Sequence, residues 1–189
     1  MKKIGILGGT FNPPHIGHLI MANEVQDALK LDEIWFMPTY VPPHKATDIW
    51  TQPFHRLKMI EVAIVGHPSF SIQRIEFERR GKSYTYETMK ILREQYPNSD
   101  FHFIIGADMI ESLSEWHRID ELLHLVTFVG VNRPGYSRQS PYPILQVEAP
   151  TIDLSSSLIR EKIKKGQTIR YLVPDEVEKY IEENHLYGS

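Results

Sequence analysis

Residues 3–18 read KIGILGGTFNPPHIGH, and this stretch decides the class of fold. Residues 3–7, with the apolar run 4–7, end at two glycines, which is the pattern of a short buried strand followed by a turn. A helix is expected over residues 16–30, where apolar side chains recur at helical spacing, and a second apolar strand over 34–37. Such a strand–helix–strand unit of about 35 residues suits a right-handed βαβ crossover.

The alternation of strands and helices continues along the chain. Further strands are expected at 69–75, 101–105, 125–131 and 144–147, and further helices at 53–65, 84–96, 155–165 and 174–184. Short apolar strands that alternate with helices indicate a parallel sheet covered on both faces. The predicted fold is therefore α/β, a Rossmann-like doubly wound, mostly parallel sheet with a small C-terminal helical segment at about 153–189. Residues 1–189 are expected to form a single domain, because one core can extend over a chain of this length.

Composition excludes several classes of protein. The chain has no cysteine, which rules out disulfides and thiolate metal sites and fits a reducing compartment. A net charge of -3 gives no reason to expect a nucleic acid as partner. The apolar run after Lys2 and Lys3 is too short for a signal peptide, and the longest apolar stretch, 122–131, is about half a membrane span. We therefore expect a cytoplasmic protein that binds neither nucleic acid nor membrane.

Residues 8–18, here called the glycine-histidine segment, have the features of an anion site. Gly8 and Gly9 let the backbone pass close to a bulky anion, and the helix that follows presents its N–H groups and the positive end of its dipole. His15 and His18 lie three residues apart, so both imidazoles are expected on one face of the first helical turn, where they can donate to phosphate oxygens. The segment therefore predicts a phosphate site at the first βα turn.

Each of these features also has a simpler interpretation. A glycine pair after a strand usually forms only a turn, and two histidines at this spacing are usually exposed surface residues without a function. A zinc site lacks a third ligand, and a dinucleotide-binding fold lacks the G-x-G-x-x-G pattern. It is the placement of the whole segment after the first strand that favours phosphate binding.

Three other stretches carry polar residues at predicted strand or helix ends. Three serines, Ser155 to Ser157, open the penultimate helix with Arg160 one turn later, which serves either as a cap or as a second anion site. Lys45 lies in the loop after the second strand, where a lysine is normally solvated. Gly106 and Asp108 follow the strand 101–105, where an acidic residue suits a ribose or adenine contact or a helix cap.

The glycine-histidine segment resembles the T/HxGH signature of the nucleotidylyltransferase superfamily. The strings near residues 42, 82, 104, 133 and 155 are similar, in the same order, to those of the bacterial nicotinate mononucleotide adenylyltransferases (nicotinate-nucleotide adenylyltransferases). This resemblance spans nearly the whole chain. It implies an enzyme of NAD biosynthesis that transfers AMP from ATP to nicotinate mononucleotide and releases pyrophosphate.

The resemblance also implies roles for individual residues. His18, His15 and Arg160 would be catalytic, with His18 stabilising charge around the α-phosphate. The ATP-binding residues would be Gly8, Gly9, Thr10, His15, His18, Lys45, Gly106, Asp108, Ser155, Ser156 and Arg160. Contacts to nicotinate mononucleotide would come from Phe11, Thr85, Trp116 and Arg133, with Thr85 binding the carboxylate through its main chain and Trp116 stacking on the pyridine. Many relatives carry Asp where this chain has Asn12, so position 12 is given no catalytic role.

The remaining expectations concern the metal, the acceptor and the assembly. Mg²⁺ is expected to arrive with ATP, because no carboxylate cluster predicts a metal site on the protein itself. Nicotinamide mononucleotide and phosphopantetheine are alternative acceptors, and a non-catalytic ATP sensor is an alternative of another class. The oligomeric state is left open, with a homodimer as one alternative.

Overall fold

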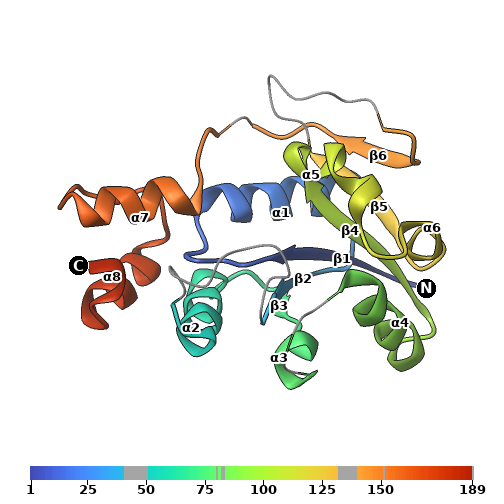
Figure 1. Cartoon of the computed structure of the whole chain (residues 1–189), viewed down its shortest axis with the longest axis horizontal. Coiled ribbons are helices and arrows are strands. Elements are labelled where there is room, and N and C mark those ends of the chain that lie inside the picture. Colours follow the sequence, from blue (N-terminus) through green and yellow to red (C-terminus); the bar gives the residue numbers. More distant parts are fainter. Residues whose placement is uncertain (41–50, 80, 82–83, 132–139, 151, 189) are drawn as a thin grey trace.

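The core of the protein is a six-stranded parallel sheet (Figure 1). The computed structural model describes residues 1–40, 51–79, 81, 84–131, 140–150 and 152–188. The strands are β1 (Lys2–Gly9), β2 (Glu33–Pro38), β3 (Phe70–Ile72), β4 (Ser99–Gly106), β5 (Thr127–Val131) and β6 (Ile144–Val147). Their order across the sheet is β3-β2-β1-β4-β5-β6, which confirms the prediction of a doubly wound α/β fold.

Eight helices connect or follow the strands in the described part of the chain. They are α1 (Ile16–Leu29), α2 (Pro53–Ala63), α3 (Ile75–Arg79), α4 (Thr85–Gln95), α5 (Ala107–Glu111), α6 (Ile119–Leu122), α7 (Ser156–Lys164) and α8 (Asp175–Glu183), with short 3-10 turns η2 (Leu113–Glu115) and η3 (Leu186–Gly188). Pro53 stands at the first position of α2, where its missing N–H costs nothing. None of the described helices is long and apolar enough to cross a membrane.

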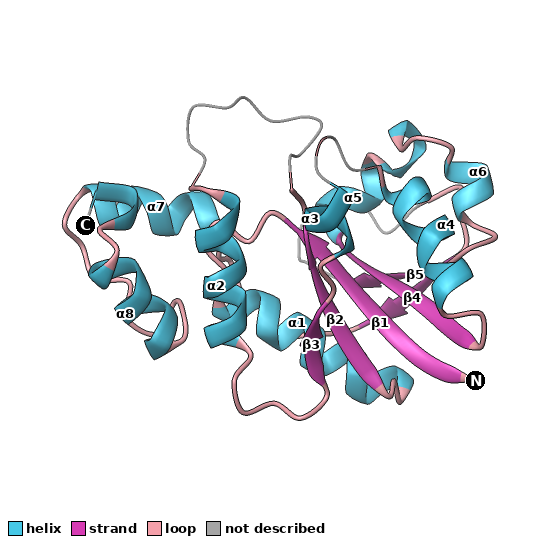
Figure 2. Ribbon diagram, turned by 90° about the horizontal axis from the view of Figure 1, so that it is seen from below, coloured by secondary structure: helices cyan, strands magenta, loops and turns pink. Residues whose placement is uncertain are grey.

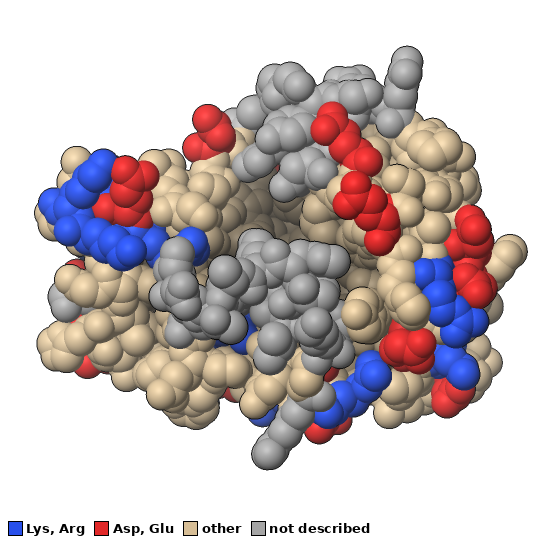
Figure 3. Space-filling view, in the orientation of Figure 1, with Lys and Arg blue, Asp and Glu red and all other residues tan. Residues whose placement is uncertain are grey.

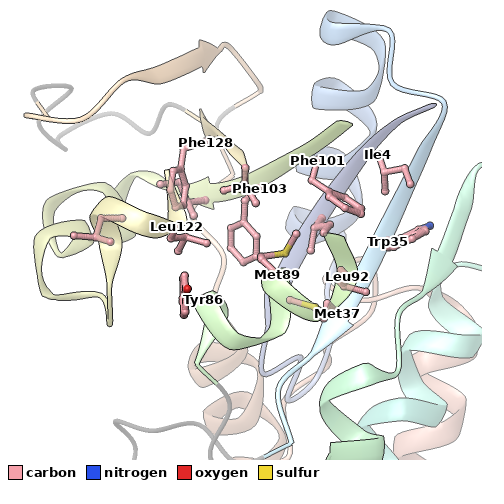
Figure 4. Close-up of a cluster of buried hydrophobic side chains, with 14 of the residues drawn as sticks. Ile4, Trp35, Met37, Tyr86, Met89, Leu92, Phe101, Phe103, Leu122 and Phe128 are labelled. Atoms are coloured by element: carbon pink, nitrogen blue, oxygen red, sulfur yellow. The ribbon is translucent and has the colours of Figure 1, made fainter. Parts of the chain in front are cut away.

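Apolar side chains cover both faces of the sheet. On one face, α4 packs on β4 through aromatic and sulfur-containing side chains, and the helices α5 and α6 complete this cluster. Figure 4 labels ten of its members: Ile4, Trp35, Met37, Tyr86, Met89, Leu92, Phe101, Phe103, Leu122 and Phe128. On the other face, Ala22 and Val25 of α1 pack on Leu7 and Val129. Because both faces are buried, the central strands are continuous apolar runs, as the sequence indicated.

Two expected strands are shorter than predicted. The run 69–75 forms strand only at Phe70–Ile72, and α3 begins at Ile75, whose N–H donates to the side chain of Gln73 at 3.1 Å. The run 125–131 begins as strand at Thr127, because the N–H groups of Leu125 and Val126 bond to the carbonyl of Leu122 at the end of α6. Apolar periodicity could not predict where β3 ends and β5 begins, because local hydrogen bonds determine these bounds.

The C-terminal helices pack beyond one end of the sheet. Figure 2 shows α7 and α8 next to α2, away from the fan of strands. A separate apolar cluster joins them, in which Met59 and Ala63 of α2 contact the buried faces of the later helices. The helices α7 and α8 lie within the C-terminal helical segment expected at about 153–189. That the chain forms a single domain stays a prediction.

Candidate active site

The glycine-histidine segment lies at the point where the strand order reverses. β1 pairs with β2 on one side and with β4 on the other, so the carboxyl ends of β1 and β4 are neighbours. Gly8 and Gly9 end β1, and Gly106 ends β4, with Leu7 and Ile104 in register just before them. Ligands of open parallel sheets bind at this reversal. Figure 3 shows a hollow in the middle of one face of the molecule, with Lys and Arg side chains gathered over α7 on one of its sides.

The two histidines form a stacked pair at the start of α1. His15 is the N-cap and is buried, and its ring stacks on that of His18 with centroids 3.7 Å apart. The N–H of His15 donates to Nδ1 of His18 at 3.1 Å. A nitrogen that accepts a hydrogen bond carries no proton, so the neutral His18 ring has its proton on Nε2. The main chain thereby makes Nε2 of His18 a hydrogen-bond donor.

Close packing around the two rings explains Phe11 and Gly17. Phe11 has a φ of 50° and is 1% exposed, and its ring meets His18 edge-on at 5.0 Å. That Phe11 contacts nicotinate mononucleotide stays a prediction. A Cβ at Gly17 would come within 3.1 Å of the His15 ring, so the absence of a side chain there makes room for the histidine stack.

The serine run and Arg160 do meet the glycine-histidine segment. Ser156 donates to the carbonyl of Pro13 at 2.8 Å, and Nη1 of Arg160 donates to the carbonyl of Asn12 at 2.8 Å. Ser155 caps α7, because its Oγ accepts the N–H of Leu158 at 3.2 Å. These polar groups therefore hold main chain in this structure, and their contacts to phosphate remain a prediction.

Arg56 of α2 belongs to the same region, although the sequence did not indicate it. Its guanidinium is 1% exposed and donates to three main-chain carbonyls, those of Thr10 at 2.9 Å, Thr39 at 2.7 Å and Tyr40 at 2.8 Å. Burial lowers the pKa of Arg56 to about 10, so the group is still charged at neutral pH. It ties the end of β1 to the residues that follow β2. An arginine in an amphipathic helix is normally exposed, so the local sequence pattern could not predict that Arg56 is buried here.

The two residues expected at the acceptor lie on neighbouring elements. Thr85 is the first residue of α4, so its main chain belongs to the N-terminus of that helix. Trp116 follows η2 and is partly buried, edge-on to Phe103 and Phe128 at 5.8 and 5.9 Å. The residues adjacent to them also meet, since the rings of Tyr84 and His117 lie 4.8 Å apart.

Some expected site residues cannot be placed. Lys45 and Arg133 lie outside the described residues, and so does the side chain of Asp108, although its backbone belongs to α5. Within the described part of the chain, no group of three or more histidine, aspartate or glutamate side chains could hold a metal ion.

Comparison with known proteins places this arrangement in a family. A family model described as cytidylyltransferase-like matches residues 6–162. Over all 189 residues the chain is 61% identical to the "probable nicotinate-nucleotide adenylyltransferase" of Geobacillus kaustophilus, covering 100% of this chain and 88% of that protein. It is 53% identical to the nicotinate-nucleotide adenylyltransferase of Bacillus subtilis, with 100% of both chains covered. The chain belongs to the nicotinate-nucleotide adenylyltransferase family. The resemblance drawn from the motifs is confirmed.

A solved structure supports the fold of this family member. The nicotinic acid mononucleotide adenylyltransferase of Plasmodium falciparum, complexed with NaAD, superposes with a TM-score of 0.84 at 22% identity, over 99% of this chain and 98% of that one. At this identity the likeness concerns the fold. It covers the C-terminal helices as well as the sheet.

Proposed function

We propose that this chain transfers the adenylyl group of ATP to nicotinate mononucleotide, giving nicotinate adenine dinucleotide and pyrophosphate. The observation that carries the proposal is the stacked histidine pair at the N-terminus of α1, at the reversal point of the sheet. The full-length relatives named for this activity support the choice of acceptor.

Catalysis of this reaction requires that the two substrates be positioned and that the charge on the phosphates be neutralised. A phosphate oxygen of the acceptor attacks the α-phosphorus of ATP, the bond to the β-phosphate oxygen breaks, and pyrophosphate leaves. The attacking oxygen is already anionic, so no general base is needed. Negative charge on the phosphates is stabilised by hydrogen-bond donors at a helix N-terminus, and His18, with its proton on Nε2, is one such donor. We assign His15, Thr10 and Arg160 to the same group of phosphate contacts.

Mg²⁺ enters this proposal as part of the ATP substrate. The described residues contain no group of carboxylates and histidines that could hold it by themselves. The protein's own contribution is to orient the nucleotide, through the glycine turn after β1 and the start of α7.

The acceptor end of the site is assigned to Thr85, Trp116 and Arg133. The N-terminus of α4 offers main-chain N–H groups for a carboxylate, and Trp116 offers an aromatic face for the pyridine ring. Lys45 and Asp108 are assigned to ATP because their motifs resemble those of the family. A cytoplasmic location also stays a prediction, and the oligomeric state stays open, with a homodimer as one alternative.

The test is pyrophosphate release with ATP and Mg²⁺ in the presence of nicotinate mononucleotide, nicotinamide mononucleotide or phosphopantetheine. We expect release to be fastest with nicotinate mononucleotide. Faster release with either of the other two would give the chain a different acceptor. Binding of ATP without release in all three mixtures would make it an ATP sensor and overturn the proposal.

A further inference from the structure

Tyr187, two residues from the C-terminus, reaches the glycine-histidine segment. Its hydroxyl donates to the side-chain carbonyl of Asn12 at 2.6 Å, between residues 175 positions apart in the chain. Asn12 is itself 4% exposed, so the bond is shielded from water. In Figure 1 the C-terminus lies beside α7 and α8. A side chain with no contact to substrate in the proposed function is thus bonded to the segment that carries the histidines.

Packing contacts hold Tyr187 in its position. Its φ of 63° lies in the left-handed region, which disfavours any residue with a side chain, and surrounding contacts must offset this cost. Those contacts come from the C-terminal cluster, in which Tyr187 packs with residues of α2, α7 and α8. Burial raises the pKa of the hydroxyl to about 12, so it remains a donor throughout the neutral range.

The turn that receives this bond is held from several elements at once. Arg56 of α2 binds the carbonyl of Thr10, Arg160 of α7 binds the carbonyl of Asn12, and Ser156 binds that of Pro13. Those three bonds go to main-chain oxygens, whereas Tyr187 binds the side chain of Asn12. His15 follows the turn by two residues, so a displaced turn would also move the stacked rings.

We propose that Tyr187 is a positioning residue for adenylyl transfer, which acts through Asn12 on the turn that places His15 and His18. The proposal rests on the function proposed above, and it extends the active site to the last residues of the chain. Since misplacement of reacting groups by even 1 Å is costly, the loss of this bond should lower kcat more than it raises the KM for ATP.

The main experiment compares Tyr187→Phe with Tyr171→Phe. The first removes the hydroxyl that binds Asn12 and that also interacts with the side chains of Thr51 and Met59. The second removes a hydroxyl from a tyrosine that is 79% exposed. We expect kcat to fall roughly tenfold in Tyr187→Phe with a KM for ATP within about twofold of wild type, and to stay unchanged in Tyr171→Phe. An unchanged kcat in folded Tyr187→Phe, or a rise in KM alone, would overturn the proposal.

A double-mutant cycle tests whether Asn12 transmits the effect. Asn12→Ala removes the acceptor, so adding Tyr187→Phe to it should cause no further loss, whereas two independent effects would multiply. Asn12→Asp keeps an acceptor oxygen and should preserve the dependence on Tyr187.

One measurement does not depend on activity. The imidazole NMR signals of His15 and His18 in the free protein should shift in Tyr187→Phe and stay in place in Tyr171→Phe. If wild type proved inactive with every acceptor, the proposed function would fail, and these signals would still decide whether Tyr187 positions the histidines. Unshifted signals in both variants would refute the coupling.

Discussion

At the scale of single residues, the two ring nitrogens of His18 have different roles. Nδ1 accepts the N–H of His15 and so helps to close the first turn of α1, while Nε2 carries the proton that a phosphate oxygen would receive as a hydrogen bond. Stacking on His15 and edge contact with Phe11 hold the ring in this orientation. The fixed tautomer is the feature that makes this histidine suited to an anionic ligand.

Replacing His18 should therefore affect turnover more than folding. We expect His18→Ala to lower kcat by about 10²–10³, the usual cost of losing one donor to developing charge. His18→Gln keeps an amide donor near the position of Nε2 and should lose less. Pyrophosphate release at saturating substrates measures both, with His124→Ala as the control, because His124 is an exposed histidine away from α1. Wild-type turnover in folded His18→Ala would remove His18 from the catalytic group.

Arg56 gives a prediction about stability at the same scale. Arg56→Met should lower the free energy of unfolding by about 3–5 kcal/mol, because three buried carbonyls would lose a charged donor. Lys58→Met, on the same helix, removes an ion pair with Glu61 that is partly exposed and should cost under about 1 kcal/mol. Urea titrations of the two variants measure the difference. Equal midpoints would show that the guanidinium bonds contribute little.

At the scale of elements, the start of α7 shows how one serine run serves two purposes. Ser155 caps its own helix, and the next residue, Ser156, points away from the helix to the carbonyl of Pro13. The sequence indicated a cap or an anion site at this serine run, and the structure shows the cap at Ser155. The sequence could not predict which hydroxyl binds which partner, because this depends on the angle at which the two elements meet.

Substitutions in this run should separate folding from activity. Ser155→Ala should lower the free energy of unfolding by about 1 kcal/mol, and Ser155→Asn, which restores a cap, should recover most of it. Ser156→Ala leaves the cap intact and removes the bond to Pro13, so its main effect should be on kcat. Thermal unfolding and pyrophosphate release, measured on all three variants, test the assignment. It would fail if Ser155→Ala left stability unchanged.

At the scale of the whole molecule, the sheet and the C-terminal helices share α2. Ile60 of that helix packs in the cluster on the α1 face of the sheet, while Met59 and Ala63 pack against the C-terminal helices. A helix with one side in each cluster links their unfolding. We therefore expect the whole chain to unfold in one step.

This cooperativity can be tested from α8. Ile181→Ala removes a side chain that is 1% exposed and should cost about 2–5 kcal/mol, whereas Lys179→Ala on the exposed face of the helix should cost little. In a Trp50→Phe background the remaining tryptophans, Trp35 and Trp116, both belong to the cluster on the α4 face. Their fluorescence and the far-UV circular dichroism should shift to the same lower midpoint in urea. Separate midpoints would show that the C-terminal helices unfold on their own.

The sequence by itself determined the order of the main strands and helices, the glycine turn after β1 and the start of α1. These depend on residues within one or two turns of each other, and periodicity and capping report on that range. The recurrence of motifs along the chain also identified the family and the reaction class. The sequence did not predict short helices such as α3 and α5, because one or two capping hydrogen bonds determine whether they form.

Only the tertiary structure decided which side chains hold the glycine-histidine segment. Arg56 is 46 positions from Thr10, and Tyr187 is 175 from Asn12, so no local pattern links either pair. Both contacts exist because α2 and the C-terminal helices pack together beside the end of the sheet. The residues that provide the chemistry could thus be predicted from their motif, whereas the residues that place them depend on packing between distant parts of the chain.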